Sequence, residues 1–256
     1  MRWQSVSEVR FGGPITEFER EEARQIQQSL LPAGPLEGSS FEITYRFSPY
    51  AGVGGDFADF FDLPDGKVGL YVGDIVGKGL PAALYAALVM GMLRGIHKSG
   101  QDTATALAIL NQRMLVRPLK GRYATTLYAI FDPATRKLTF SNAGLPYPLL
   151  ASESGCILLG AGGLPSGLFP GANYESYTAQ LYPGDVVLFA TDGLHELRNR
   201  ADQDFSWEKM QEIWMECRCK SAEQSLNLLF EEAREFSEGG SEQHDDITAV
   251  VLKVCG

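Results

Sequence analysis

Four separate stretches of the chain place an aspartate beside glycine or at the expected end of a strand. They read YAGVGGDFADFF (50–61), LYVGDIVGKG (70–79), VVLFATDGL (186–194) and EQHDDITAVVL (242–252). Because strand ends on one side of a sheet can converge in space, we expect one carboxylate from each stretch to share a site. The candidate residues are Asp56, Asp74, Asp192 and Asp245.

Such a cluster predicts a bound cation, because neighbouring carboxylates repel one another unless a positive charge lies among them. All-oxygen sites suit hard ions such as Mg²⁺ or Mn²⁺. Two such ions about 4 Å apart can bind a phosphate, lower the pKa of a bridging water and stabilise the leaving oxygen. The chain contains no G-x-S-x-G, Walker A or H-E-x-x-H pattern. The sequence therefore favours metal-assisted hydrolysis over covalent catalysis.

A single aspartate beside glycine more often marks a turn. The aspartates interpreted as structural are Asp59, Asp62, Asp65, Asp132 and Asp185. Gly54 and Gly55 precede Asp56 directly, which indicates a backbone bend or the close approach of another group.

Periodicity predicts the elements that position these residues. Helices are expected over 16–31, 77–100, 102–115, 207–218 and 221–236, the first with a capping box between Thr16 and Glu19. Strands are expected over 41–47, 57–63, 67–74, 124–131, 137–141, 147–150, 174–181, 185–191 and 247–254. Loops are expected over 32–40 and 239–243. This order predicts an α+β fold with helices covering a sheet assembly.

Composition narrows the class of protein. The chain has 256 residues, 45% hydrophobic residues and a net charge of −10, which suits one large domain and argues against nucleic acid as the main partner. Its four cysteines make no disulfide framework. Residues 1–13 have no apolar core of a signal peptide, and the apolar stretch 80–93 is shorter than the roughly 20 residues of a membrane span. We therefore expect a cytoplasmic protein without a membrane partner.

The motifs VGGDFADFF, GDIVGKGLPAAL, AGLPYPLL, LFATDGLHE and DDITAVVL follow one another along residues 53–252. In this order they resemble the metal-dependent protein phosphatases (the PPM or type 2C superfamily), and most of all the bacterial SpoIIE/RsbU-like branch. The resemblance implies a four-layer αββα sandwich of two antiparallel sheets flanked by helices. It also implies an N-terminal tail over 1–15, a linker or regulatory helix and loop over 16–40, and a phosphatase domain over 41–256.

The resemblance further implies residue roles. Asp74 would bridge two Mn²⁺ or Mg²⁺ ions, and the backbone carbonyl of Ile75 would help to bind one of them. Asp192 and Asp245 would hold the other ion, and Asp56 would hold one directly or through water. A metal-bridging hydroxide would then attack phosphoserine or phosphothreonine. The implied substrate is a phosphorylated STAS-type anti-sigma-factor antagonist.

Alternative interpretations stay open at this point. His244 and Asp245 also form the dyad of HD phosphohydrolases, which are all-helical. Within the resembled phosphatase family, Leu145 stands where A-G-H-P often has histidine, so a contribution of that histidine would be lost, although the metal mechanism does not require it. The domain could also bind a STAS protein without turnover.

The helix over 16–31 has a thin apolar stripe, composed of Phe18, Ala23, Ile26 and Leu30. Such a stripe suits pairing with a second copy, giving a homodimer, or docking on the domain's own surface. We expect this helix to bias the site between a metal-competent and a metal-poor state, the alternative being a passive linker.

Overall fold

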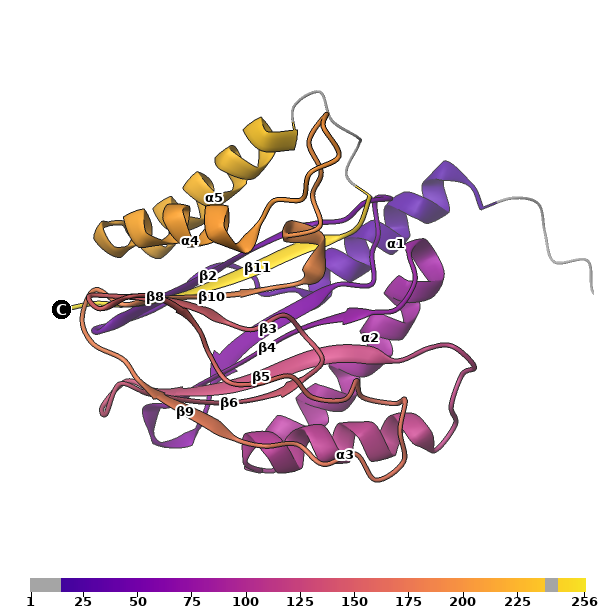
Figure 1. Ribbon diagram of the computed structural model, residues 1–256. Coiled ribbons are helices and arrows are strands. Elements are labelled where there is room, and N and C mark those ends of the chain that lie inside the picture. Colours follow the sequence, from indigo (N-terminus) through magenta and orange to yellow (C-terminus); the bar gives the residue numbers. More distant parts are fainter. Residues whose placement is uncertain (1–14, 238–243) are drawn as a thin grey trace, which may run out of the picture.

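Alternating apolar residues in the strands bury one face of each of two antiparallel sheets against the other (Figure 1). The computed structural model describes residues 15–237 and 244–256. Of the predicted tail over 1–15 only Ile15 is described, and the loop predicted over 239–243 lies outside the described residues. The proposed division into tail, linker and phosphatase domain stays a prediction.

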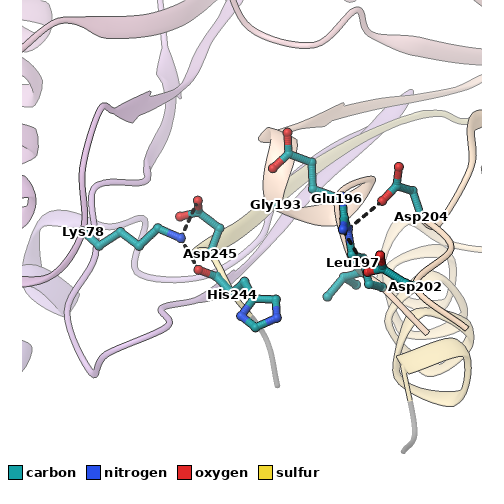
Figure 2. A pocket seen from close by; sticks show the side chains of 9 residues that line it. Lys78, Gly193, Glu196, Leu197, Asp202, Asp204, His244 and Asp245 are labelled. Carbon is teal, nitrogen blue, oxygen red and sulfur yellow. Dashed lines mark hydrogen bonds and ion pairs between the residues drawn. The ribbon is translucent and has the colours of Figure 1, made fainter. Parts of the chain in front are cut away.

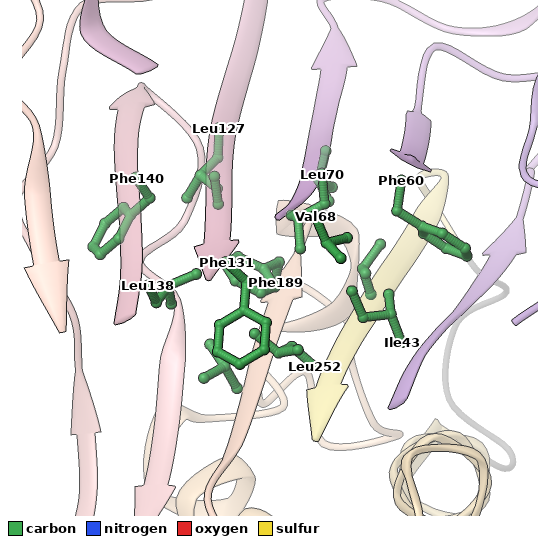
Figure 3. Close-up of a cluster of buried hydrophobic side chains, with 14 of the residues drawn as sticks. Ile43, Phe60, Val68, Leu70, Leu127, Phe131, Leu138, Phe140, Phe189 and Leu252 are labelled. Carbon is green, nitrogen blue, oxygen red and sulfur yellow. The ribbon is translucent and has the colours of Figure 1, made fainter. Parts of the chain in front are cut away.

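The first sheet has six strands, ordered β1 (Leu36–Gly38), β2 (Phe41–Ser48), β11 (Ile247–Val254), β10 (Val186–Ala190), β7 (Leu149–Ser152) and β8 (Gly155–Leu158). The second sheet has five, ordered β3 (Phe57–Asp62), β4 (Val68–Ile75), β5 (Ala124–Asp132), β6 (Lys137–Ala143) and β9 (Tyr177–Gln180). Side chains of both sheets meet in one core, in which Phe189 and Leu252 of the first sheet lie close to Phe131 of the second (Figure 3).

Helices cover the outer face of each sheet. On the second sheet lie α2 (Gly79–His97) and α3 (Thr103–Leu115), and on the first lie α4 (Trp207–Glu216) and α5 (Ala222–Ser237). Short 3₁₀ turns occupy Pro64–Gly66, Asp192–Leu194 and Cys217–Cys219. The result is the predicted αββα sandwich, and α1 (Glu17–Leu30) packs beside it on α2.

Helix α2 is long and apolar enough to cross a bilayer by length and composition. In the fold it packs on β4 and α3, and its buried residues share a core cluster with Phe57 and Tyr71. It is therefore a core helix, as its apolar sequence predicted.

The structure differs from the predicted elements at two sheet edges. The loop predicted over 32–40 contains the short strand β1, which pairs with β2, and β8 pairs with β7 where no strand was predicted. Both strands are three or four residues long and largely exposed, so periodicity could not reveal them. The strand predicted over 174–181 is limited to Tyr177–Gln180, the part that pairs with β6.

Candidate active site

The predicted site residues all lie at one end of the two sheets. Asp56 directly precedes β3, Asp74 lies near the end of β4, Asp192 begins the 3₁₀ turn after β10, and Asp245 lies two residues before β11. Strand register places them together. Phe57 pairs with Gly73 in one sheet, and Ala190 pairs with Ala249 in the other.

Asp74 is partly buried near three other carboxylates, whose charges act on it. Burial, followed by the negative charges of Asp192, Asp245 and Asp246, raises this pKa to about 7. The structure therefore brings Asp74, Asp192 and Asp245 into one electrostatic environment, as the sequence predicted.

Asp56 is the most deeply buried of the predicted ligands, with 1% of its surface exposed. The hydroxyl of Thr191 donates to its Oδ2 at 2.8 Å, and the backbone N–H of Thr248 donates to that hydroxyl at 2.9 Å. Burial, with the charges of Asp74 and Asp246, raises the pKa of Asp56 well above its ordinary value. Asp56 is thus held by residues of the first sheet and its adjoining turn, although it directly precedes a strand of the second sheet.

The two glycines before Asp56 are required by close contacts. A Cβ on Gly55 would lie 2.7 Å from the carbonyl oxygen of Ile75 and 3.0 Å from Oδ1 of Asp74. A Cβ on Gly54 would lie within 2.5 Å of three atoms of the Asp246 carboxylate. The glycines therefore make room for other ligand groups and for Asp246, in addition to the approach to Asp56 that the sequence suggested.

Asp246 organises the loop that carries Asp56, a role that the sequence analysis missed. Its carboxylate accepts hydrogen bonds from the backbone N–H groups of Tyr50 at 2.7 Å and Gly55 at 2.6 Å. The side chain is buried, whereas Asp245 is partly exposed. The available signal was the doubled aspartate before the last strand, because adjacent residues there point to opposite sides.

Helix α1 also reaches this loop, through Gln27. The Gln27 amide donates to the carbonyl of Gly54 at 2.7 Å and accepts from its N–H at 3.0 Å. Gln27 lies at helical spacing between Ala23 and Leu30, so the apolar stripe contained a polar position that could have been noticed. By contrast, Phe18 and Ile26 of the predicted stripe are exposed.

A cavity of about 410 Å³ opens beside Asp245 (Figure 2). Lys78 and His244 lie with Asp245 on one side, and Glu196, Asp202 and Asp204 lie on the other. Lys78 Nζ is 2.9 Å from Asp245 Oδ2 and also donates to the His244 carbonyl. His195 does not line this cavity; its ring stacks on Trp207.

The donor chemistry fits Mg²⁺ or Mn²⁺, because the expected ligands, four aspartate side chains and the Ile75 carbonyl, offer oxygen alone. The space that Gly55 leaves open is bordered by the Ile75 carbonyl and by Asp74, two of the expected ligands. Among the described residues, no three histidine, cysteine or carboxylate side chains are close enough to form a finished cation site. The ligand roles of the individual residues stay predictions.

Comparison with known proteins agrees with this architecture. The family model "Stage II sporulation protein E (SpoIIE)" matches residues 64–255. The chain is 23% identical to the phosphoserine phosphatase RsbU of Bacillus subtilis, over 92% of this chain and 70% of that protein. The chain spans 43% of the length of protein IcfG of Synechocystis and 24% of that of the stage II sporulation protein E of Bacillus subtilis.

Solved structures share the fold. The SiaA-PP2C domain of Pseudomonas aeruginosa superposes with a TM-score of 0.81 at 20% identity, covering 92% of this chain and 95% of that one. RsbX in complex with magnesium superposes with a TM-score of 0.65 at 17% identity, covering 86% and 98%. The two-sheet fold excludes the all-helical HD alternative. The chain belongs to the SpoIIE family and has the fold of the PP2C-type protein phosphatases, which confirms the resemblance that its motifs indicated.

Proposed function

We propose that this chain is a metal-dependent protein serine/threonine phosphatase. The observation that carries the proposal is the meeting of carboxylates from both sheets at one end of the fold, beside a cavity that can admit a phosphorylated side chain. Membership of the SpoIIE family and the similarity to a phosphoserine phosphatase support the same activity.

The proposed ligand set follows the predicted roles. Asp74 and the Ile75 carbonyl would hold one Mn²⁺ or Mg²⁺ ion, and Asp74 would share a second with Asp192 and Asp245. Asp56, fixed by Thr191, would hold one ion directly or through water. Two divalent cations, when bound, would supply positive charge for the phosphate and activate water for hydrolysis. The magnesium complex of RsbX, which shares the fold, supports this choice of cation.

The side chains around the cavity are mainly acidic, so by themselves they would repel a phosphate rather than bind it. The cavity wall offers Asp245, and the opposite wall is lined by Glu196, Asp202 and Asp204. Arg198 lines the cavity too, but it is paired with Asp202 at 2.8 Å and Asp204 at 3.1 Å. With this arginine engaged, phosphate recognition would fall mainly to the cations, and substrate choice to the surrounding protein surface.

We propose a phosphorylated STAS-domain protein as that substrate, in a cytoplasmic partner-switching system. A folded partner suits a cavity whose rim carries several charged groups, because such a rim can select a surface as well as a phosphate. We also propose that α1 contributes to a homodimer. Phe18 and Ile26 on α1 and Leu84 and Leu88 on α2 leave large apolar side chains exposed.

The test is dephosphorylation of purified phosphorylated STAS proteins by the full chain with Mn²⁺, with Mg²⁺ and with excess chelator. We expect turnover with either cation and none in chelator. A short phosphopeptide from the same protein should be a poorer substrate. Undiminished turnover in chelator would contradict the metal-dependent mechanism, and tight binding of the STAS protein without turnover would favour a non-catalytic binding module.

A further inference from the structure

Lys78 extends into the acidic end of the fold from the loop that follows two expected ligands, Asp74 and Ile75 at the end of β4. It precedes α2 and lies four residues after Asp74. The flanking residues Gly77 and Gly79 have φ angles of 101° and 66°, which side-chain-bearing residues rarely adopt. The two glycines thus give the loop the turn that directs Lys78 toward Asp245.

Three groups surround the Lys78 ammonium. Asp245 Oδ2 lies 2.9 Å away, the His244 carbonyl accepts a hydrogen bond, and the ring centroid of Tyr50 lies 5.6 Å away. The side chains of Lys78 and Asp245 are 43% and 34% exposed, so the pair is neither fully buried nor fully solvated. A positive charge therefore occupies one side of a carboxylate that the proposed function assigns to a cation.

We propose that Lys78 is a built-in counter-cation for Asp245 and competes with the divalent cation for that carboxylate. This inference rests on the proposed function. In the metal-free protein Lys78 neutralises Asp245 and reduces the repulsion among the clustered carboxylates. Lys78 must leave Asp245 before that carboxylate can serve as a metal ligand.

Competition has two linked consequences. The Lys78–Asp245 contact stabilises the metal-free protein and contributes nothing once the site is loaded. The free energy by which Lys78 stabilises the metal-free state therefore makes the free energy of metal binding less favourable by the same amount. A device of this kind keeps the acidic site folded without metal and raises the metal concentration at which the site fills.

The test compares Lys78→Met with wild type in the full chain. By calorimetry we expect Mn²⁺ to bind about fivefold more tightly to Lys78→Met, the size of one partly exposed ion pair. In excess chelator the variant should melt about 2–4 °C lower than wild type. In saturating Mn²⁺ this difference should vanish.

Lys209→Met is the matched control. Lys209 Nζ pairs with Glu232 at 3.7 Å and lies over the rings of Phe205 and Phe236, with exposure similar to that of Lys78. Since this pair lies on α4 and α5, its loss should shift the melting temperature equally with and without Mn²⁺ and leave Mn²⁺ affinity unchanged.

Arg198→Met tests whether the loss of any positive charge at the cavity would tighten Mn²⁺ binding. Arg198 lines the same cavity as Lys78 but pairs with residues other than Asp245. Equal tightening by Arg198→Met and Lys78→Met would overturn the inference. Unchanged Mn²⁺ affinity in Lys78→Met would also overturn the inference, but it would leave the proposed function standing. If wild type and Lys78→Met both fail to bind Mn²⁺ at millimolar concentration, the proposed function itself fails.

Discussion

Aspartates occur at both ends of the two-sheet sandwich, and they are held in opposite ways. At the far end, Asp132 closes the β5–β6 turn and accepts from the N–H groups of Ala134 at 3.0 Å and Thr135 at 3.3 Å. At the site end, Asp74 lies among carboxylates from distant parts of the chain, which together with burial raise its pKa to about 7. The first aspartate is stabilised by its own turn, whereas the second is destabilised by its neighbours.

This difference distinguishes aspartates that stabilise a turn from aspartates that form the candidate active site. A turn aspartate has its partners two or three residues away, and its charge is compensated locally. The groups around the site bridge long separations instead. Thr191 and Asp56 are 135 residues apart, and Gly55 and Asp246 are 191 residues apart. Hydrogen bonds and one ion pair compensate these carboxylates only in part, and the repulsion that remains among them lowers stability unless a bound cation offsets it.

The sharpest test of this comparison is one charge removed from each end. Asp74→Asn should lower phosphatase turnover by about a thousandfold or more, because it removes the ligand proposed to bridge both ions. Asp132→Asn should change turnover less than twofold. Turnover of a phosphorylated STAS protein with saturating Mn²⁺ measures both.

The same two substitutions should also change the melting temperature of the metal-free protein, in opposite directions. In excess chelator, Asp74→Asn should melt higher than wild type, because one repelling charge is gone. Asp132→Asn should melt slightly lower, because the turn loses part of its acceptor. Full activity of Asp74→Asn would refute the two-ion proposal.

The sequence predicted the fold class and the acidic end because both leave local signals. Alternation located β2 and β4, whereas β3, β10 and β11 were located as apolar runs bounded by turn or loop residues. The strand ends then suggested that the four aspartates meet on one side. The motif resemblance supplied the two-sheet topology, which periodicity alone could not, since strand order in a sheet depends on contacts between distant residues.

The residues whose roles were not predicted are placed by packing between distant segments, which the pattern of a single sequence does not reveal. Asp246 differs from Asp245 in direction, which the pleat decides only once the strand start is known. Asp59 was grouped with the turn aspartates, but it lies in β3, buried, and accepts from Tyr71 at 2.9 Å and Arg94 at 2.8 Å. The role of Gln27 required knowing that α1 folds back on the loop before β3.

The adjacent residues Asp245 and Asp246, just before β11, also differ in role. Asp246 holds backbone N–H groups, whereas Asp245 belongs to the cluster of expected metal ligands. Asp246→Ala leaves two N–H groups without their charged acceptor, so we expect a loss of about 3 kcal/mol of unfolding free energy. Asp245→Asn removes one repelling charge but also weakens the ion pair with Lys78, so in chelator its unfolding free energy should differ from that of wild type by less than about 1 kcal/mol. Urea unfolding of both variants in chelator is the measurement, and equal destabilisation by the two would contradict the assigned roles.

Glycines extend the comparison to backbone contacts. Gly55→Ala places a Cβ against a backbone oxygen and should cost about 2 kcal/mol, with weaker Mn²⁺ binding, because Ile75 and Asp74 must shift. Gly91 lies in α2 with no atom within 4 Å of an added Cβ, so Gly91→Ala should stabilise the fold by about 0.5–1 kcal/mol. A Gly55→Ala protein with wild-type stability and Mn²⁺ affinity would show that this close approach is unimportant.

The smallest expected effect concerns α1, which contacts the site end through Gln27. Gln27→Ala removes both hydrogen bonds to Gly54, and we expect a loss of about 1 kcal/mol together with a several-fold lower Mn²⁺ affinity, because the loop before Asp56 loses its anchor. Gln25→Ala is the control on the same helix, since Gln25 is exposed and bonds only to Glu21 in its own helix among the contacts described. If α1 biases the site between metal-competent and metal-poor states, Gln27→Ala lowers Mn²⁺ affinity and turnover together while Gln25→Ala changes neither. If Gln27→Ala lowers stability but leaves Mn²⁺ affinity and turnover at wild-type values, α1 is a passive linker that merely packs on the domain.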